Sequence, residues 1–273
     1  MNLVILLLLS LVSFGVVWGG QTLLLYLDGA ENPRRGMFRI KDASSFVRIA
    51  IAVLVQVVLV GIVLGYPLLL GQDPLDYHKT KTLPVQTERF FELLLVTLLC
   101  FVVGVGGEML MGWVQLAPRY GPLKSTRKVV EAVIRPIPLA CLEEGIFRGI
   151  VLEQLMLALR PGPIETVSAI VGSAAVFSSL HFIRPAKTYG PALGLFVLGC
   201  LLGTAYIVGG HTYWLPVGVH AGGVLAIKLL QPFVEYRGPS WVIGDRTYPI
   251  AGVVGIGAML LIGLYILARF GMP

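Results

Sequence analysis

Charged side chains are scarce in this chain. Asp, Glu, Lys and Arg make up 13% of its 273 residues, whereas hydrophobic residues make up 56%. A soluble domain of this length carries about 25% charged residues, so the shortage excludes an ordinary soluble domain and indicates a polytopic membrane protein. The net charge of +6 is therefore no sign of a nucleic-acid partner, because basic loops of membrane proteins set their topology.

Cysteines and metal-binding patterns are equally sparse. Cys100, Cys141 and Cys200 lie within apolar segments and follow no metal-ligand spacing. We interpret them as small packing residues. The sequence contains no HExxH pair, internal repeat or low-complexity tract, so it predicts one helical membrane domain.

Long apolar runs dominate what is present. A helix needs roughly 20 apolar residues to cross a bilayer. Eight runs qualify, at 1–27, 46–71, 90–116, 132–159, 165–183, 191–209, 213–230 and 250–270. The first run has no basic start and no clear cleavage site, which favours a retained helix over a signal peptide. The prediction is an all-α, multi-pass membrane protein with about eight transmembrane helices.

Lysine and arginine are distributed unevenly between the loops. The loops after the first, third, fifth and seventh predicted spans hold fifteen of them. The opposite side holds five, namely Lys79, Lys81, Arg89, Arg160 and Arg269. The positive-inside rule then predicts cytoplasmic basic loops and both termini outside. These loops also suit anionic lipid headgroups, although topology alone explains them.

Three charged residues fall inside the fourth predicted span, in the stretch LEEGIFR. A charge at the bilayer centre costs about 2.5–3.5 kcal/mol, so Glu143, Glu144 and Arg148 must face a protein interior or a wet cavity. Glu144 and Arg148 are one helical turn apart with the acid first, which is the favourable order for an ion pair. Glu143 is rotated by about 100° from that pair and is left as a spare carboxylate that suits a base.

Two histidines occupy other predicted spans. His181 ends the stretch FSSLH, one turn after Phe177, and His220 lies among small residues that let helices approach closely. A lone buried histidine is usually a core residue, but two histidines and a glutamate pair on three spans indicate a site. His78 and His211 lie in predicted loops and receive no role.

These motifs together have the pattern of a known family. EEGIFR matches E-E-x-x-x-R, FSSLH matches F-x-x-x-H, and His220 stands where a final H-x-x-x-N/D motif is expected. In this order they resemble the CPBP family of intramembrane peptidases, which includes the CAAX prenyl-protein endopeptidases and the bacteriocin-processing or Abi proteins. The resemblance implies a catalytic helical core at 131–230. It leaves 1–130 as variable N-terminal helices and 231–273 as a loop with a final helix.

The resemblance implies an intramembrane endopeptidase that acts on a membrane-embedded or lipid-anchored protein, in the manner of CAAX processing. We expect a multi-pass protein of a prokaryotic inner membrane, with the lipid bilayer as its surroundings. Glu143 and His181 are predicted to hold and deprotonate a water molecule, because a carboxylate shielded from water is a suitable general base. His220 is predicted to donate to the oxyanion, and Arg148 to orient Glu144.

A metal-dependent mechanism would use the same side chains. Two histidines and a glutamate, here His181, His220 and Glu143, suit Zn²⁺ with an open water position. We favour the metal-free form and expect no cofactor, because Glu143 and Glu144 already serve as base and as arginine partner.

Two other functional classes compete with a peptidase. Val224 occupies the position where the family pattern has Asn or Asp, which favours a non-catalytic membrane interaction or immunity protein of the same fold. Intramembrane charges also mark proton-coupled carriers, although the paired, interrupted halves typical of carriers are absent from the sequence. Glu108, in the third predicted span, either hydrogen-bonds between helices or lines the same cavity.

Overall fold

The computed structural model of the protein describes residues 2–29, 43–79, 83–160, 162–181, 190–244 and 249–271. Helices dominate these ranges, where the strands are two three-residue segments. The predicted all-α class is confirmed. The chain divides into two compact units, Met1–Tyr77 and His78–Pro273. The boundary predicted at residue 130 followed the extent of the sequence motifs rather than the packing, and it stays a prediction.

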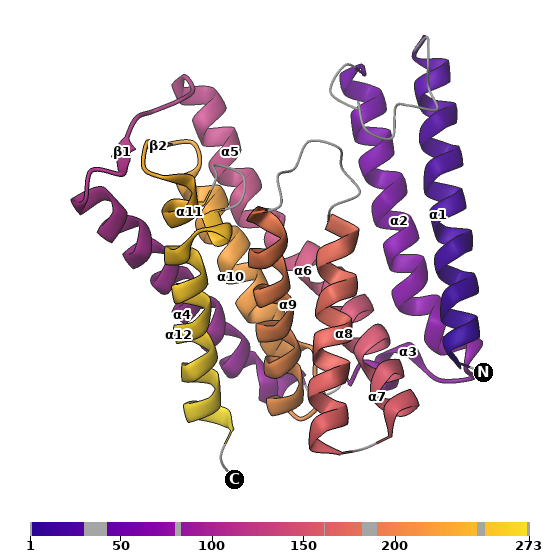
Figure 1. The fold of residues 1–273 in the computed structure, drawn as a ribbon. Coiled ribbons are helices and arrows are strands. Elements are labelled where there is room, and N and C mark those ends of the chain that lie inside the picture. The colour runs from indigo at the N-terminus through magenta and orange to yellow at the C-terminus, as the bar shows by residue number, and fades with distance from the viewer. Residues whose placement is uncertain are drawn as a thin grey trace. The chain divides into compact units, whose positions relative to one another are not determined.

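The first unit is a helical hairpin (Figure 1). Helices α1 (Asn2–Leu27) and α2 (Ser45–Leu69) lie side by side, and the short α3 (Pro74–Tyr77) follows them. Ser44 caps α2 by accepting a hydrogen bond from the Val47 amide at 3.3 Å. The buried contact is small, and most apolar side chains of both helices are exposed. Apolar residues exposed all round a helix are expected where lipid replaces water as the surroundings.

The second unit holds the predicted motifs. Its long helices are α4 (Leu83–Leu110), α8 (Pro163–His181), α9 (Gly190–Val208), α10 (Trp214–Leu230) and α12 (Val253–Phe270). The segment between α4 and α8 contains β1 (Val114–Leu116), α5 (Pro122–Ile134), α6 (Pro136–Ile146), the π-helix η4 (Phe147–Leu152) and α7 (Glu153–Leu159). β2 (Val234–Tyr236), α11 (Ser240–Ile243) and the 3₁₀ turn η5 (Pro249–Ala251) connect α10 to α12.

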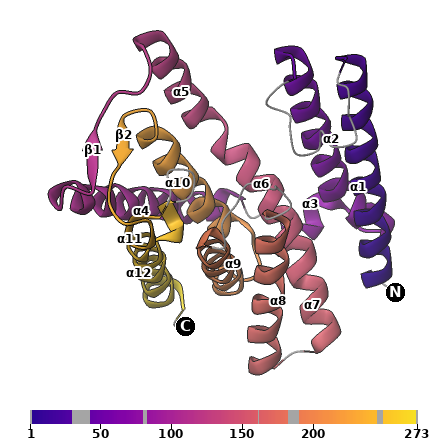
Figure 2. The ribbon, with the colours of Figure 1, turned by 45° about the horizontal axis from the view of Figure 1, so that its top comes forward.

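Consecutive long helices of this unit run in opposite directions. α8, α9, α10 and α12 alternate, and α4 crosses them obliquely (Figures 1 and 2). β1 pairs antiparallel with β2, with Val114 opposite Tyr236. This small sheet, α11 and the start of α5 lie at one end of the unit, and the C-terminal end of α12 lies at the other (Figure 1). We call the former the basic end, because α5 carries Lys124, Arg127 and Lys128 there and the nearby loops carry Arg119 and Arg237.

The predicted spans agree with the helices in most cases. Within the described ranges, six helices are long and apolar enough to cross a bilayer, namely Val4–Leu27, Ser45–Leu69, Gln86–Leu110, Pro163–His181, Pro191–Val208 and Val253–Phe270. A seventh apolar helix, Trp214–Leu230, is shorter. The predicted span 132–159 consists of the end of α5 followed by α6, η4 and α7. The count of eight is therefore not confirmed.

One predicted helix end was wrong. The third span was expected to reach residue 116, but α4 ends at Leu110. Gly112 adopts φ +74°, a left-handed conformation that an α-helix does not contain. The apolar residues Val114 and Leu116 then continue as strand β1, which a short apolar run does not distinguish from helix.

Helix α10 packs closely against α4. A Cβ atom added to Gly218 would lie 2.6 Å from the Phe90 carbonyl oxygen, and one added to Gly222 would lie 2.5 Å from the Leu94 carbonyl oxygen. Both separations are impossible without moving a backbone. The small residues beside His220 thus allow the close helix contact that the sequence predicts.

The contact at Gly222 can be tested against its neighbour. Gly222→Ala should destabilise the protein by about 1–3 kcal/mol relative to Gly223→Ala, because overpacking forces α10 away from α4. A Cβ atom on Gly223 meets the Phe101 ring at 3.6 Å and the Thr97 methyl group at 3.8 Å, which are ordinary van der Waals contacts. Both variants replace a helical glycine with alanine and share the same gain in helix propensity. Melting curves in detergent give the comparison, and equal melting temperatures would contradict the close contact.

Candidate functional site

The two glutamates lie at the end of a helix whose hydrogen-bonding pattern then changes. α6 carries Glu143 and Glu144, and the π-helix η4 that follows carries Arg148. Such π turns are rare in proteins overall, and those that occur often lie at functional sites. Ser173 on α8 donates a hydrogen bond to the Phe147 carbonyl oxygen at 3.0 Å. This bond ties the first residue of η4 to α8.

Glu144 and Arg148 form the predicted ion pair. Arg148 Nη1 lies 3.0 Å from Glu144 Oε1 and 2.9 Å from Oε2, and both side chains have 0% exposure. Arg148 Nη2 donates to the Gly199 carbonyl oxygen at 3.0 Å. The guanidinium also lies 4.9 Å from the centre of the Phe177 ring. α9 approaches α8 closely here, since a Cβ atom on Gly199 would lie 2.8 Å from that of Ala174.

His220 contacts the same buried glutamate from α10. Its Nδ1 lies 2.7 Å from Glu144 Oε1. An ionised carboxylate only accepts hydrogen bonds, so Nδ1 is the donor. This bond orients the ring so that Nε2 lies 3.7 Å from Glu143 Oε2. Glu144 therefore has two partners, Arg148 and His220, where the sequence predicted only the arginine.

His181 approaches Glu143 from the end of α8. Its Nδ1 lies 2.8 Å from the Phe177 carbonyl oxygen. A carbonyl oxygen only accepts, so Nδ1 carries a proton and Nε2 is turned to the other side. That Nε2 atom lies 4.0 Å from Glu143 Oε2. The Phe177 ring packs against both His181 and His220.

The structure thus brings all five predicted site residues together in two layers. Glu144 and Arg148 are fully buried and His220 nearly so, whereas the side chains of Glu143 and His181 are 18% and 28% exposed. In the buried layer, Glu144 and Arg148 neutralise each other. The accessible layer presents one carboxylate oxygen with two imidazole Nε2 atoms directed towards it.

The distances between these side chains bear on the predicted zinc alternative. Tetrahedral ligands held 2.0–2.1 Å from Zn²⁺ lie about 3.4 Å from one another, which is less than the 3.7 and 4.0 Å found here. Among the residues that the structure describes, no group of three His, Cys, Asp or Glu side chains is arranged to hold a metal. In this arrangement Glu143, His181 and His220 are spaced more widely than the ligands of a regular tetrahedral Zn²⁺ site. The metal-free form stays a prediction.

The other residues considered in the sequence do not belong to this group of five. Glu108 is buried on α4 and interacts electrostatically with Tyr236 of β2. The three cysteines are free and partly buried, as expected of packing residues. His211, to which the sequence assigned no role, forms a hydrogen bond with Glu153, with 2.7 Å between its Nδ1 atom and Glu153 Oε1. The sequence did not reveal the parts played by Ser173 and the Gly199 carbonyl oxygen, because a hydroxyl or backbone partner leaves no distinctive motif.

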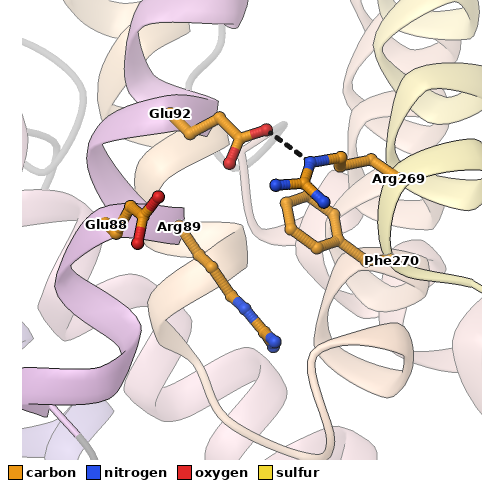
Figure 3. Close-up of a pocket in the computed structure, with 5 residues that line it drawn as sticks. All are labelled: Glu88, Arg89, Glu92, Arg269 and Phe270. Carbon is orange, nitrogen blue, oxygen red and sulfur yellow. Dashed lines mark hydrogen bonds and ion pairs between the residues drawn. The ribbon is translucent and has the colours of Figure 1, made fainter.

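A surface pocket of about 300 Å³ lies away from these residues, between α4 and α12 (Figure 3). It is lined by Glu88, Arg89, Glu92, Arg269 and Phe270. Its charges are largely matched, because Glu92 accepts hydrogen bonds from Tyr265 and Arg269. None of the predicted site residues lines it.

The buried ion pair predicts a large effect of removing one partner. Arg148→Ala should destabilise the protein by about 3–5 kcal/mol, because Glu144 loses its cation. The double variant Glu144→Gln/Arg148→Met should recover much of this loss. Lys128→Ala, which breaks the exposed pair with Glu131, is the control and should cost about 0–1 kcal/mol. A wild-type melting temperature for Arg148→Ala would show that the pair carries no stability.

Comparison with known proteins gives a match over the segment that contains the site. No curated protein and no solved structure gives a significant match to the chain. A family model does match: residues 125–225 fit the Rce1-like family, described as type II CAAX prenyl endopeptidase Rce1-like. The matched segment runs from α5 to α10 and contains all five site residues. It confirms the predicted resemblance to the CPBP peptidases over residues 125–225.

Proposed function

We propose that the protein is an intramembrane endopeptidase that hydrolyses a peptide bond with water activated by Glu143. One observation carries the proposal. The Nε2 atoms of His181 and His220 converge on Glu143 Oε2, while Arg148 and His220 occupy Glu144. The family match supports protease activity in general. The residue roles rest on this geometry.

Glu143 is the proposed base because it is the accessible carboxylate of the pair. Its distances to the two imidazole nitrogens, 3.7 and 4.0 Å, are too long for direct hydrogen bonds. They suit a small polar group shared between the three side chains. The water oxygen attacks the peptide carbonyl carbon while Glu143 takes one water proton. The C–N bond then breaks, and Glu143 passes this proton to the leaving amine.

His220 is the proposed oxyanion donor, in line with the role expected from the sequence. Its Nδ1 proton is held by Glu144, so donation from Nε2 requires the doubly protonated ring. Glu143, Glu144, Arg148 and a charged His220 together carry no net charge, which satisfies the demand that buried charges be balanced. A single donor of this kind contributes about 3–4 kcal/mol to the transition state.

The proposed substrate is a membrane-embedded or lipid-anchored protein, cleaved in the manner of CAAX processing. The matched family is described as type II CAAX prenyl endopeptidase Rce1-like, which supports this class of substrate. Among the described residues, six helices are apolar and long enough to span a membrane. α8 and α9 belong to the matched segment, and the other four precede or follow it along the chain. A substrate held at the bilayer by a lipid group would therefore be delivered at the depth of the protein's own helices.

The accessible layer gives the main test. Glu143→Ala and His181→Ala should each abolish cleavage of a lipidated peptide by the reconstituted protein, with melting temperatures near wild type. The double variant should be no less active than either single one, because residues that act as a unit are not additive. His211→Ala, which removes a histidine–glutamate contact outside the site, is the matched control. Full activity in Glu143→Ala or His181→Ala would overturn the proposal.

A chelator distinguishes the metal-free form from the zinc form in the same assay. Dialysis against a strong chelator should leave the cleavage rate of the wild-type protein unchanged. Loss of activity on dialysis, with recovery on adding Zn²⁺, would show that Glu143, His181 and His220 rearrange to bind a metal.

Replacing Val224 tests whether the valine at this motif position leaves the site without a hydrogen-bond donor. It is partly buried, one turn after His220, on the helix that Gly222 presses against α4. We expect the packing to have adjusted to valine. Val224→Asn should then add an unsatisfied amide, lower stability by about 1–3 kcal/mol and leave kcat unchanged. A rise in kcat of up to about tenfold at unchanged stability would show instead a vacant donor position, worth about 1.4 kcal/mol.

A further inference from the structure

Helix α5 has three distinct faces. One face packs inwards, with Ser125 and Ala132 buried against the rest of the unit. The second is apolar yet exposed: Leu123, Val130 and Ile134 are 86%, 50% and 65% accessible. These three residues lie seven and four positions apart, so they form one stripe along the helix. Exposing such an apolar stripe to water is unfavourable in free energy.

The third face is charged and lies beside the apolar stripe. It carries Lys124, Arg127 and Lys128, with a single acid, Glu131, paired to both Arg127 and Lys128. Arg127 remains 79% exposed and Lys128 43% exposed despite these pairs. Lys124 packs its ammonium group over the Tyr120 ring, 4.4 Å from the centre. The face has a net positive charge and is open to its surroundings.

The position of α5 explains why both faces coexist. The helix begins at the basic end, beside the β1–β2 sheet, and runs obliquely into α6 (Figures 1 and 2). Its 13 residues cover about 20 Å, which is too short to span a bilayer. A helix with an apolar stripe and a flanking basic face at the end of membrane-spanning helices has the features of an interfacial helix.

We propose that α5 lies in the membrane interface, with its apolar stripe in the acyl region and its basic face on anionic phospholipid headgroups. The phosphate groups supply the negative charge that a single glutamate leaves unmatched. Since α5 leads directly into α6, bound lipid would sit next to the helix that bears Glu143.

The preference of the protein for anionic over zwitterionic lipid tests whether the charged face of α5 binds headgroups. Native mass spectrometry of the full-length protein should show tighter binding of phosphatidylglycerol than of phosphatidylcholine. Each cation near an anionic surface contributes about fivefold. The variant Lys124→Gln/Arg127→Gln/Lys128→Gln should therefore weaken phosphatidylglycerol binding at least about fivefold after allowance for Glu131. The matched control, Arg89→Gln/Arg160→Gln/Arg269→Gln, removes the same charge elsewhere and should retain the preference. Equal losses in both variants would overturn the proposal.

Nitroxide labels report whether the apolar stripe faces lipid or water, and this test does not depend on the charge variants. In a cysteine-free background reconstituted in bilayers, a label at residue 130 should collide with oxygen, and one at residue 127 with a water-soluble nickel chelate. A residue 130 label that meets the nickel chelate would place the stripe in water. One that is shielded from both reagents and coupled to a second label would place it against another copy of the chain. Either outcome overturns the proposal, whether or not the protein is a peptidase.

Discussion

The contact between Glu144 and its two partners governs the arrangement of the site. A carboxylate inside an apolar helical unit needs a compensating charge, and Arg148 supplies it from one turn away at full burial. Glu144 then has an oxygen available for His220 Nδ1, which directs the other ring nitrogen towards Glu143. The buried charge thus fixes the orientation of the accessible one, and the neighbouring helices must approach closely enough to make these contacts.

Small residues permit that approach. Gly222 brings α10 against α4 and Gly199 brings α9 against α8. The Gly199 carbonyl oxygen then reaches Arg148, and His220 reaches Glu144. The π turn η4 adds a further constraint, since its first carbonyl group is held by Ser173 of α8.

Composition predicted the helical membrane fold, and motif spacing selected five residues that the structure brings close together. Glu144 and Arg148 were paired correctly because a helix alone determines their separation. The sequence did not predict the hydrogen bond between His220 and Glu144, since these residues lie 76 positions apart on different helices. Nor did it predict strand β1, because Val114 and Leu116 extend an apolar run that a helix also fits. The interruption of span 132–159 by a π turn has no sequence signal that we can name.

The proposed division between a neutralised Glu144 and a working Glu143 can be seen directly with a substrate mimic. A lipidated peptide ketone that hydrates at the scissile carbonyl imitates the tetrahedral intermediate. In a structure of its complex, one hydroxyl should lie within about 2.6–3.2 Å of the Glu143 carboxylate, the other should face His220 Nε2, and Glu144 should keep its contact with Arg148. A hydroxyl bound to Glu144 with Arg148 displaced, or a ketone bound away from Glu143, would contradict the account.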